Sequence, residues 1–445
     1  MDILVIIFCK ILSFFTNIFG GGTNLPGSVA LKARPHILKK LAAGYRIIAV
    51  TGTNGKTTTS AMLASILRTT GRHVVSNESG ANMKSGITSK LISAYPIFKK
   101  TDGDFAVLEC DEAYLKYVTD DINPEIIAVT NIFRDQLDRY GEVSKTLKMI
   151  EEGCAKTDSV LVLNGDDPLL ANLLPERKRY FYGFRVNPDV SKSEVQNAEG
   201  KFCTVCGSPY SYNFTTFNHL GDYFCPVCGF QKPALALGVS AQPEFSPDET
   251  KVSFDGLDIT VPQPGAYNVY NALCAAAAAG AAGVCPDDIK TGIEAQECKF
   301  GRQETVEIDG RQLRLILVKN PAGCDEAINS VLADTGEVEI GFLLNDNYAD
   351  GTDVSWIYDV GFEKLARLDY QNVAIGGTRC YDAAIRLSVA GLNSNKFIIC
   401  EDFDSLLYAI KTNLRGRIYL FCTYTAMISL RKFLHKKGYI KKLWY

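Results

Sequence analysis

The sequence predicts an α/β fold with two parallel-sheet domains in series and a small four-cysteine insertion within the first domain. Three observations lead to this prediction. Short β-rich runs alternate with helical stretches in both halves of the chain, a glycine-containing loop joins the first such run to a helix, and two Cys-x-x-Cys pairs interrupt the first half. Alternation of this kind is typical of βαβ units on a parallel sheet.

The first domain is expected to span residues 46–300. Its β-rich runs are residues 47–50, 105–110, 126–130 and 160–163, and its clearest helical stretches are residues 57–70 and 270–282. The second domain, residues 301–445, has the size of an ordinary domain and repeats the same rhythm, so we expect a Rossmann-like α/β fold. Its β-rich runs are residues 313–318, 338–344, 372–376, 396–400 and 418–421.

Residues 1–45 are expected to form an apolar helix and a lead-in to the first domain. Residues 1–19 are strongly apolar, but Lys10 interrupts them and no small-residue cleavage site follows at 20–24. The segment therefore fits neither a secretory signal peptide nor a membrane-spanning helix. Two interpretations remain open, a buried helix and an interfacial helix that lies on a membrane.

Bulk composition excludes some classes of protein. The 445 residues include 47 basic and 50 acidic side chains, a formal charge of −3, which gives no broad electrostatic attraction for nucleic acid. The 14 cysteines are too dispersed for the disulfide framework of a short secreted domain. A reducing, cytoplasmic location is the better expectation.

A phosphate-binding loop is predicted where the first β-rich run meets its helix. Glycines in such a loop let backbone N–H groups approach phosphate oxygens, while Lys56 supplies a positive charge for the β and γ phosphates and the Thr57 hydroxyl can ligate Mg²⁺. Val50 stands where the general pattern has a glycine, so the loop is a variant. The residues expected to bind MgATP here are Gly52, Thr53, Asn54, Gly55, Lys56, Thr57 and Thr58.

A carboxylate at the end of a neighbouring strand should complete the metal site. Glu109 is the first choice, because Mg²⁺ takes oxygen ligands and needs few from the protein when it keeps several waters. Asp111 and Glu112 follow directly. Each could cap the N-terminus of a helix or take a direct part in the site.

The four-cysteine insertion, about residues 187–264, is predicted to hold a structural zinc ion. The spacing is C-x2-C-x18-C-x2-C, and four thiolates would leave no open position on a tetrahedral ion. A nucleic-acid-binding ribbon is the competing idea, but Lys201 and Lys232 are the basic residues that flank the two pairs. His219 is expected to be a loop residue. The predicted zinc ligands are Cys203, Cys206, Cys225 and Cys228.

Five segments, in order along the chain, resemble the Mur ligase family and its folylpolyglutamate synthetase relatives: residues 52–58, Glu109, residues 131–140, 267–272 and 301–304. The resemblance implies a Mur-ligase-like central domain with an ATP loop and a strand-end glutamate for Mg²⁺. It also implies nucleotide contacts from Asn268 and Asn271, the second of them to adenine, and from Arg302.

The chain also departs from the family pattern. Only 45 residues precede Arg46, too few for the UDP-binding domain that members with nucleotide-linked substrates carry. Gln136 replaces a histidine that the family uses near the metal, and Lys145 and Lys148 are weak candidates for the lysine that many members carbamylate. In the second domain, residues 318–323 replace the family's Asp-Tyr-Ala-His-Asn-Pro segment.

Together with the cysteine insertion, these departures resemble a branch of the family that acts in peptidoglycan synthesis. The resemblance implies a ligase that amidates the D-glutamate carboxylate of the lipid II stem peptide to D-isoglutamine, by way of an acyl phosphate. Ammonia would come from a GatD-like glutaminase in a heterodimer. The sequence itself shows no nucleophile-elbow pattern at any cysteine and no recognisable histidine dyad, which agrees with a separate partner.

The resemblance further implies that an aspartate of the chain completes the partner's Cys-His pair. Asp353 is the first candidate, with Asp350 and Asp346 behind it, although a cluster of turn-forming residues explains the same pattern. Two other functions stay open on the sequence. One is a stand-alone Mur or folylpolyglutamate-type ligase that adds an amino acid, and the other is a zinc-ribbon binding protein without catalytic activity.

Overall fold

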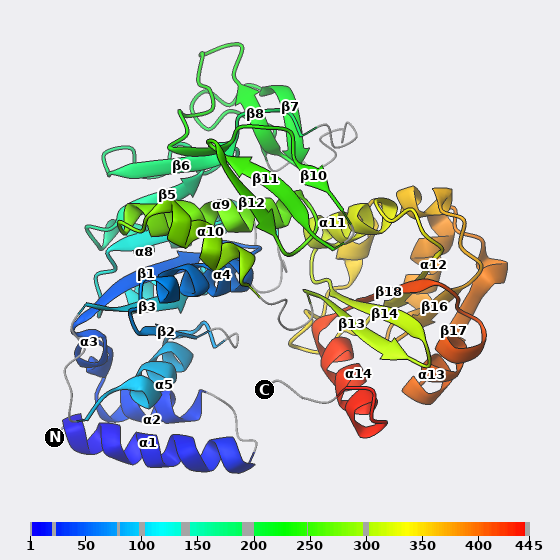
Figure 1. Ribbon diagram of the computed structural model, residues 1–445, viewed down its shortest axis with the longest axis horizontal. Helices are drawn as coiled ribbons and strands as arrows, with labels where there is room; N and C mark the ends of the chain where they lie inside the picture. The colour runs from blue at the N-terminus through cyan, green and yellow to red at the C-terminus, as the bar shows by residue number, and fades with distance from the viewer. Residues whose placement is uncertain are drawn as a thin grey trace.

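The computed structural model describes residues 2–19, 24–77, 81–97, 103–134, 143–188, 200–246, 248–296 and 302–440, without the side chains of 17–19 and 302–303. Figure 1 shows two α/β bodies side by side. The hairpin of β7 (Ser211–Phe217) and β8 (Leu220–Phe224) stands at one end of the first body, and α1 (Asp2–Phe19) lies at the other end.

The first body contains a ten-stranded sheet in the order β10-β11-β9-β6-β5-β4-β1-β3-β2, with β12 paired to β11. The seven neighbouring strands β9-β6-β5-β4-β1-β3-β2 of this sheet run parallel, as the alternating pattern predicts. Their bounds are β1 (Tyr45–Thr51), β2 (Val74–Ser76), β3 (Asp104–Glu109), β4 (Ile126–Val129), β5 (Val160–Asn164), β6 (Arg179–Phe184) and β9 (Leu237–Val239).

Both faces of this sheet are covered. Successive residues of a strand point to opposite faces, so Ile48 and Val50 of β1 face one core while Ile47 and Ala49 face the other. The first core lies under α4 (Lys56–Thr69), α9 (Ala266–Ala281) and α10 (Pro286–Glu294). The second lies under α5 (Lys84–Ala94), α6 (Leu115–Val118) and α8 (Val143–Ala155).

Much of the predicted insertion belongs to the sheet and not to the ribbon. Of residues 187–264, those between 200 and 232 hold the cysteines and the β7–β8 hairpin. Residues 237–261 form β9, β10 (Glu244–Phe245), β11 (Thr250–Phe254) and β12 (Leu257–Val261), which extend the central sheet. The Asp255-Gly256 turn between β11 and β12 has both φ angles positive, 46° and 94°, and this dipeptide is the hairpin signal that the composition of the segment obscured.

A layer of helices covers the β2 end of the sheet. It consists of α1, α2 (Leu25–Ala33), α3 (Ile37–Ala42) and α5. Gly27 of α2 lies so close to α5 that a Cβ atom there would be 1.9 Å from the Ser85 carbonyl oxygen. Helix α1 buries Ile6 and Cys9 but exposes apolar side chains on its other face, so it is a surface helix and not a wholly buried one. Among the described residues, no helix is long and apolar enough to cross a membrane.

The second body is built on a six-stranded sheet in the order β13-β14-β18-β15-β16-β17. All neighbours are parallel except the hairpin β13–β14, whose first strand the sequence analysis missed. The strands are β13 (Arg302–Ile308), β14 (Arg311–Leu317), β15 (Val338–Leu343), β16 (Val373–Gly376), β17 (Phe397–Cys400) and β18 (Arg417–Cys422). Helices α11 (Pro321–Leu332), α12 (Cys380–Val389), α13 (Phe403–Thr412) and α14 (Tyr424–Lys436) pack on its faces.

A buried carboxyl group lies where the two bodies meet. Glu326 of α11 is adjacent to the start of α9, since a Cβ atom on Gly265 would be 2.9 Å from Glu326 Oε1. Burial raises the pKa of Glu326 from 4.5 to about 7. The side chain is therefore expected to be protonated in the folded state at pH values where it is ionised in the unfolded chain.

This pKa predicts a pH dependence of stability. Between pH 4.5 and about 7 the folded state keeps a proton that the unfolded state has lost, so the free energy of unfolding should fall as pH rises through this window and level off above it. Glu326→Gln should remove that component and stabilise the protein at pH 8 by up to about 3 kcal/mol. Denaturant unfolding at pH 5 and pH 8 measures the difference, with Glu176→Gln as an exposed control. Equal pH profiles for wild type and Glu326→Gln would refute the prediction.

Candidate active site

The predicted phosphate loop lies between β1 and α4. Gly52 and Gly55 have φ angles of 117° and 85°, a left-handed conformation that other residues rarely adopt. A Cβ atom on Gly55 would lie 2.0 Å from Asn271 Oδ1, so only glycine fits this close approach. The loop therefore leads into the N-terminus of α4 with the geometry that anion-binding loops require.

The end of β4 anchors this loop from the side. The backbone N–H of Thr53 donates to the Asn131 carbonyl oxygen at 2.9 Å, and the backbone N–H of Asn54 donates to Asn131 Oδ1 at 2.9 Å. Thr130 adds a hydrogen bond from its hydroxyl to the Asn54 carbonyl oxygen at 2.7 Å. Asn131 belongs to the third of the family-like segments, and its contribution here is to hold the loop.

Lys56 lies at the centre of the loop and is buried. Its Nζ donates to the carbonyl oxygens of Gly52, at 2.5 Å, and Thr53, at 3.2 Å. Both carboxylate oxygens of Glu112 lie 3.1 Å from the same nitrogen. Of the two roles left open for Glu112, the structure therefore supports a direct one, as the ion-pair partner of Lys56. Asp111 instead accepts the backbone N–H of Ala113 at 3.0 Å, as a turn-capping residue does.

Glu109 is the last residue of β3 and points toward the same edge. Its Oε1 accepts the Asn82 side-chain amide at 3.2 Å, while its buried Oε2 has no hydrogen-bond partner among the described residues. Asn77 holds the Glu109 backbone by two hydrogen bonds, of 2.8 and 2.9 Å. A buried carboxylate oxygen without a donor fits a cation ligand, so these residues suit Mg²⁺. The asparagine-containing run that follows β2 was a signal that the sequence analysis did not use.

The two asparagines of α9 lie behind the loop. Asn271 Nδ2 donates to Asn268 Oδ1 at 3.2 Å, and the Thr59 hydroxyl donates to Asn271 Oδ1 at 3.4 Å. Both side chains are buried. Their contacts position the first turn of α4, and the expected adenine contact remains a proposal. Arg302 begins β13, but its side chain lies outside the described residues, as does Gln136.

The second body reaches the loop through α11. Asn320 caps this helix by accepting the Gly323 backbone N–H at 2.8 Å, and its Nδ2 donates to Asn54 Oδ1 at 2.9 Å. Asn320 lies in residues 318–323, the segment that departs from the family pattern. The family resemblance identified the departure, and the fold shows that this segment contacts the phosphate loop. Lys145 and Lys148 lie on the exposed face of α8, which is a poor position for a metal-site lysine.

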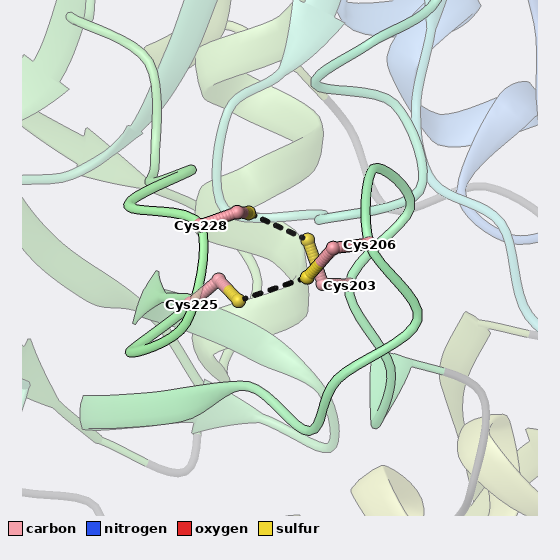
Figure 2. A group of neighbouring side chains, drawn as sticks. All are labelled: Cys203, Cys206, Cys225 and Cys228. Atoms are coloured by element: carbon pink, nitrogen blue, oxygen red, sulfur yellow. Dashed lines mark hydrogen bonds between the residues drawn. The ribbon is translucent and has the colours of Figure 1, made fainter.

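The four cysteines come together at one end of the β7–β8 hairpin, as Figure 2 shows. Their thiol sulfurs all lie within 4.8 Å of one another, with Cys203 3.6 Å from Cys228 and Cys206 3.5 Å from Cys225. Hydrogen bonds from Ser208 lower the pKa of the Cys206 thiol to about 6, which favours a thiolate. Gly207 and Gly229 follow the two pairs with φ angles of 74° and 73° and close the knuckle turns. The donor set and spacing fit a closed tetrahedral metal site.

Lys232, whose side chain is largely buried, connects the ribbon to α9 through Asp166. Lys232 Nζ lies 2.6 Å from Asp166 Oδ1, and the Tyr270 hydroxyl donates to Asp166 Oδ2 at 2.6 Å. Burial raises the pKa of Asp166, and Lys232 opposes that rise. Because Tyr270 precedes Asn271 in α9, this network connects the ribbon to the residue that packs on Gly55.

His219 provides a second connection. It lies in the β7–β8 turn and outside the cysteine cluster, so the expectation of a loop residue is confirmed, and its ring is fully buried. Its ring stacks on Phe133, with 4.7 Å between ring centroids, and its Nε2 lies 3.4 Å from Asp167 Oδ1. Phe133 in turn donates its backbone N–H to the Thr53 hydroxyl at 3.1 Å. Phe217 of β7 also packs on Phe133, with 5.2 Å between ring centroids, while Tyr223 of β8 is buried in the small core of the ribbon.

The three candidate aspartates of the second body have different environments. The Asp350 carboxylate is buried and accepts the Thr425 backbone N–H at 2.7 Å, and Asp346 pairs with Arg379 at 3.1 Å. Asp353 is exposed, and its Oδ1 accepts the Ser355 backbone N–H at 2.8 Å. Hydrogen bonds from Ser355 lower the pKa of Asp353, so it is ionised at neutral pH.

Comparison with known proteins shows to which family this chain belongs. Models of the Mur ligase middle domain and the MurT ligase C-terminal domain match residues 50–225 and 317–427. The chain is 37% identical to the lipid II isoglutaminyl synthase subunit MurT of Streptococcus pneumoniae, with 96% of each chain covered. The chain belongs to the MurT family of Mur ligases. The MurT subunit of Staphylococcus aureus is 33% identical over 83% of each chain. As a MurT-family member the chain is an ATP-dependent ligase, which confirms the family resemblance and the prediction of an enzyme.

Solved structures agree on the fold. A pseudomurein peptide ligase type C from Methanothermus fervidus has a TM-score of 0.69 at 21% identity, covering 90% of this chain and 80% of its own. The MurF ligase of Thermotoga maritima, solved in complex with ADP, has a TM-score of 0.61 at 15% identity and covers 92% and 85%. At these identities the likeness shows the Mur-ligase-like α/β architecture alone.

Proposed function

We propose that the chain is the synthetase subunit of a glutamine-dependent amidotransferase. It would use MgATP to convert the D-glutamate carboxylate of the lipid II stem peptide to the amide, giving D-isoglutamine. The proposal rests on the buried Lys56–Glu112 pair and on the buried Glu109 oxygen, which has no hydrogen-bond partner in the described part of the chain. Both lie at one edge of the sheet in a chain of the MurT family. Both relatives named above are called glutamine-hydrolysing lipid II isoglutaminyl synthase subunits.

The reaction needs an activated carboxylate, because hydroxide is a poor leaving group at neutral pH. An oxygen of the carboxylate attacks the γ-phosphorus of ATP, the bond to ADP breaks, and an acyl phosphate forms. Ammonia then attacks the acyl carbon, phosphate leaves, and a proton passes to solvent. Such a reaction depends mainly on positioning and on neutralising phosphate charge.

The residues of the loop have distinct parts in this scheme. Lys56 and the backbone N–H groups between Gly52 and Lys56 would bind the phosphates, and Thr57 and Glu109 would hold Mg²⁺, which neutralises charge on the phosphoryl group. Asn320 would keep the second body against the loop, so that residues from both bodies surround the reacting carboxylate. Asn268, Asn271 and Arg302 would complete the nucleotide site.

Ammonia would come from a glutaminase partner in a heterodimer, and the second body offers a surface for it. Helix α12 exposes Tyr381, Ile385 and Val389 on one face, with relative exposures of 58–68%. Arg379, which directly precedes α12, pairs with Asp346, so this face continues into the loop that carries Asp353. The exposed Asp353 carboxylate would orient a histidine of the partner and fix its tautomer.

The zinc site would be structural, and the protein would act in the cytoplasm at the inner face of the membrane.

A reconstituted reaction tests the function. The chain with a glutaminase subunit, MgATP, glutamine and lipid II should yield a product in which one carboxyl group has become an amide, detected by mass spectrometry. High ammonium should replace glutamine and the partner, because the synthetase site would then receive its substrate directly. If amidation never occurs but an added amino acid is incorporated, the stand-alone ligase is correct and this proposal is wrong.

Asp353 gives that assay a second arm. Asp353→Asn should reduce glutamine-dependent amidation by at least about tenfold and leave ammonium-dependent amidation unchanged, because the synthetase site is intact. Asp369→Asn, which alters another exposed carboxylate of the same body, is the matched control. Equal loss with both nitrogen sources would show that Asp353 acts in the synthetase site or in folding.

A further inference from the structure

Helix α1 carries an exposed apolar stripe along its outer face. Leu4, Phe8, Ile11 and Phe15 follow one another at i, i+4, i+7 and i+11, the spacing of one helical face. Their relative exposures are 50–67%, and Phe14 beside them is 64% exposed. Four large apolar side chains in a row on a surface exceed what scattered surface residues explain and mark an interaction site.

The opposite face of α1 is already in use. Ile6 and Cys9 are buried in the core beneath α2 and α5. Lys10 Nζ donates to the Ser93 carbonyl oxygen at 2.9 Å, and Asp2 pairs with Arg34 and Lys40. Because these contacts fix the rotation of the helix, the stripe cannot turn inward. Figure 1 shows α1 at the outer edge of the molecule, with α2 and α5 on its inner side.

The charge around the stripe is positive in a chain that is negative overall. Residues 1–45 hold five of the 47 basic residues but one of the 50 acidic residues. Lys32 and Lys39 are exposed on the neighbouring helices. A cavity of about 450 Å³ beside the C-terminus of α5 is lined by Arg68, His73 and Lys90 together with residues of β2. An apolar stripe flanked by cations matches the surface of a bilayer that contains anionic lipids.

Helix α5 runs from the inner side of α1 to the region of Glu109. Helix α5 has 11 residues and is therefore about 16 Å long. The Ser93 carbonyl oxygen, which accepts the hydrogen bond from Lys10, lies near the C-terminus of α5. Asn82, which donates to Glu109 Oε1, lies two residues before the N-terminus of α5. One helix thus joins α1 to the candidate metal site.

We propose that the outer face of α1 is a docking surface for an anionic phospholipid bilayer. Leu4, Phe8, Ile11 and Phe15 enter the boundary between head groups and acyl chains, and the basic residues of 1–45 contact the phosphates. The helix lies in the plane of the interface and does not span the membrane. If the proposed function holds, this contact brings a lipid-linked substrate to the end of the molecule from which α5 leads to Glu109.

Vesicle co-sedimentation tests this surface without ATP, substrate or partner, so its outcome is independent of the proposed function. The full chain should bind vesicles of phosphatidylglycerol and phosphatidylcholine, and bind pure phosphatidylcholine vesicles more weakly. Phe8→Ser/Phe15→Ser should weaken binding by at least about tenfold. Tyr408→Ser, which removes a 68% exposed aromatic side chain from α13, is the matched control and should bind as wild type does. Thermal unfolding confirms that the variants fold.

Three outcomes would overturn the proposal. The first is equal vesicle binding by wild type and Phe8→Ser/Phe15→Ser. The second is a dimer in light scattering that this double variant converts to a monomer, which would assign the stripe to a second copy of the chain. The third is loss of glutaminase binding by the same variant with vesicle binding unchanged, which would assign the stripe to the protein partner.

Discussion

Replacing Lys56 by alanine is expected to reduce ATP-dependent amidation by at least about a hundredfold, with ammonium or with glutamine as the nitrogen source. Lys56 Nζ is held at the centre of the phosphate loop by the carbonyl oxygens of Gly52 and Thr53, where no other described cation could replace it. Without the Lys56 ammonium, the negative charge that develops on the phosphoryl oxygens during transfer has lost a fixed counterion. Initial rates of product formation at saturating MgATP measure the loss.

The same substitution also removes the lysine partner of a buried carboxylate. Glu112 is 2% exposed and both its oxygens face Lys56, so Lys56→Ala should destabilise the protein by roughly 3–5 kcal/mol. A double variant, Lys56→Ala/Glu112→Gln, separates the two effects, because it also removes the charge of Glu112 but restores no cation. It should unfold at nearly the wild-type denaturant concentration and remain inactive. Recovery of activity in the double variant would show that Lys56 serves stability alone.

Removal of the proposed ribbon zinc is expected to have the second large effect. Zinc-finger peptides gain about 10–16 kcal/mol from their ion, and we expect Cys225→Ser or chelation to remove at least about 3 kcal/mol of stability from this protein. The ribbon has a very small core of its own, formed mainly by Tyr210, Tyr223 and the cysteines. Elemental analysis should find about one zinc ion per wild-type chain, and thermal unfolding measures the change. A zinc-free wild-type protein with unchanged stability would contradict this prediction.

We also expect the damage to reach the nucleotide site. The ribbon supports α9 through Lys232 and supports the phosphate loop through His219, so its unfolding should weaken ATP binding by at least about tenfold. Lys232→Met tests this route, because it keeps the four cysteines but leaves Asp166 without its cation. It should lower ATP affinity while zinc content stays at the wild-type value. Lys201→Met, at an exposed position of the ribbon, is the control.

Short contiguous motifs are what the sequence predicted best. The phosphate loop, the strand-end Glu109 and the two Cys-x-x-Cys pairs each depend on a few neighbouring residues, and the structure brings them to the expected places. The parallel strands were predictable for the same reason, since buried β-rich runs are local patterns. The strand β13 and the sheet part of the insertion were missed, because their hairpin turns were not weighed against the surrounding composition.

Partners distant in the sequence could not be predicted in this way. Glu112 was one of two equivalent acidic residues until the fold placed it beside Lys56, 56 positions away. Asn320 meets Asn54 across 266 positions, and Tyr270 meets Asp166 across 104. A hydrogen bond depends on distance and direction in space, and residue order along the chain carries no such information for separate elements.

The sequence by itself predicted a glycine-containing loop between a strand and a helix, a four-cysteine cluster and two α/β domains, because these follow from local spacing and hydrophobic periodicity. The tertiary structure alone decided which carboxylate neutralises Lys56, how the ribbon supports the phosphate loop, and which face of α1 remains exposed. The physical reason is that burial and pairing of charges are set by the packing of whole elements, and the residues that meet there come from separate strands and helices.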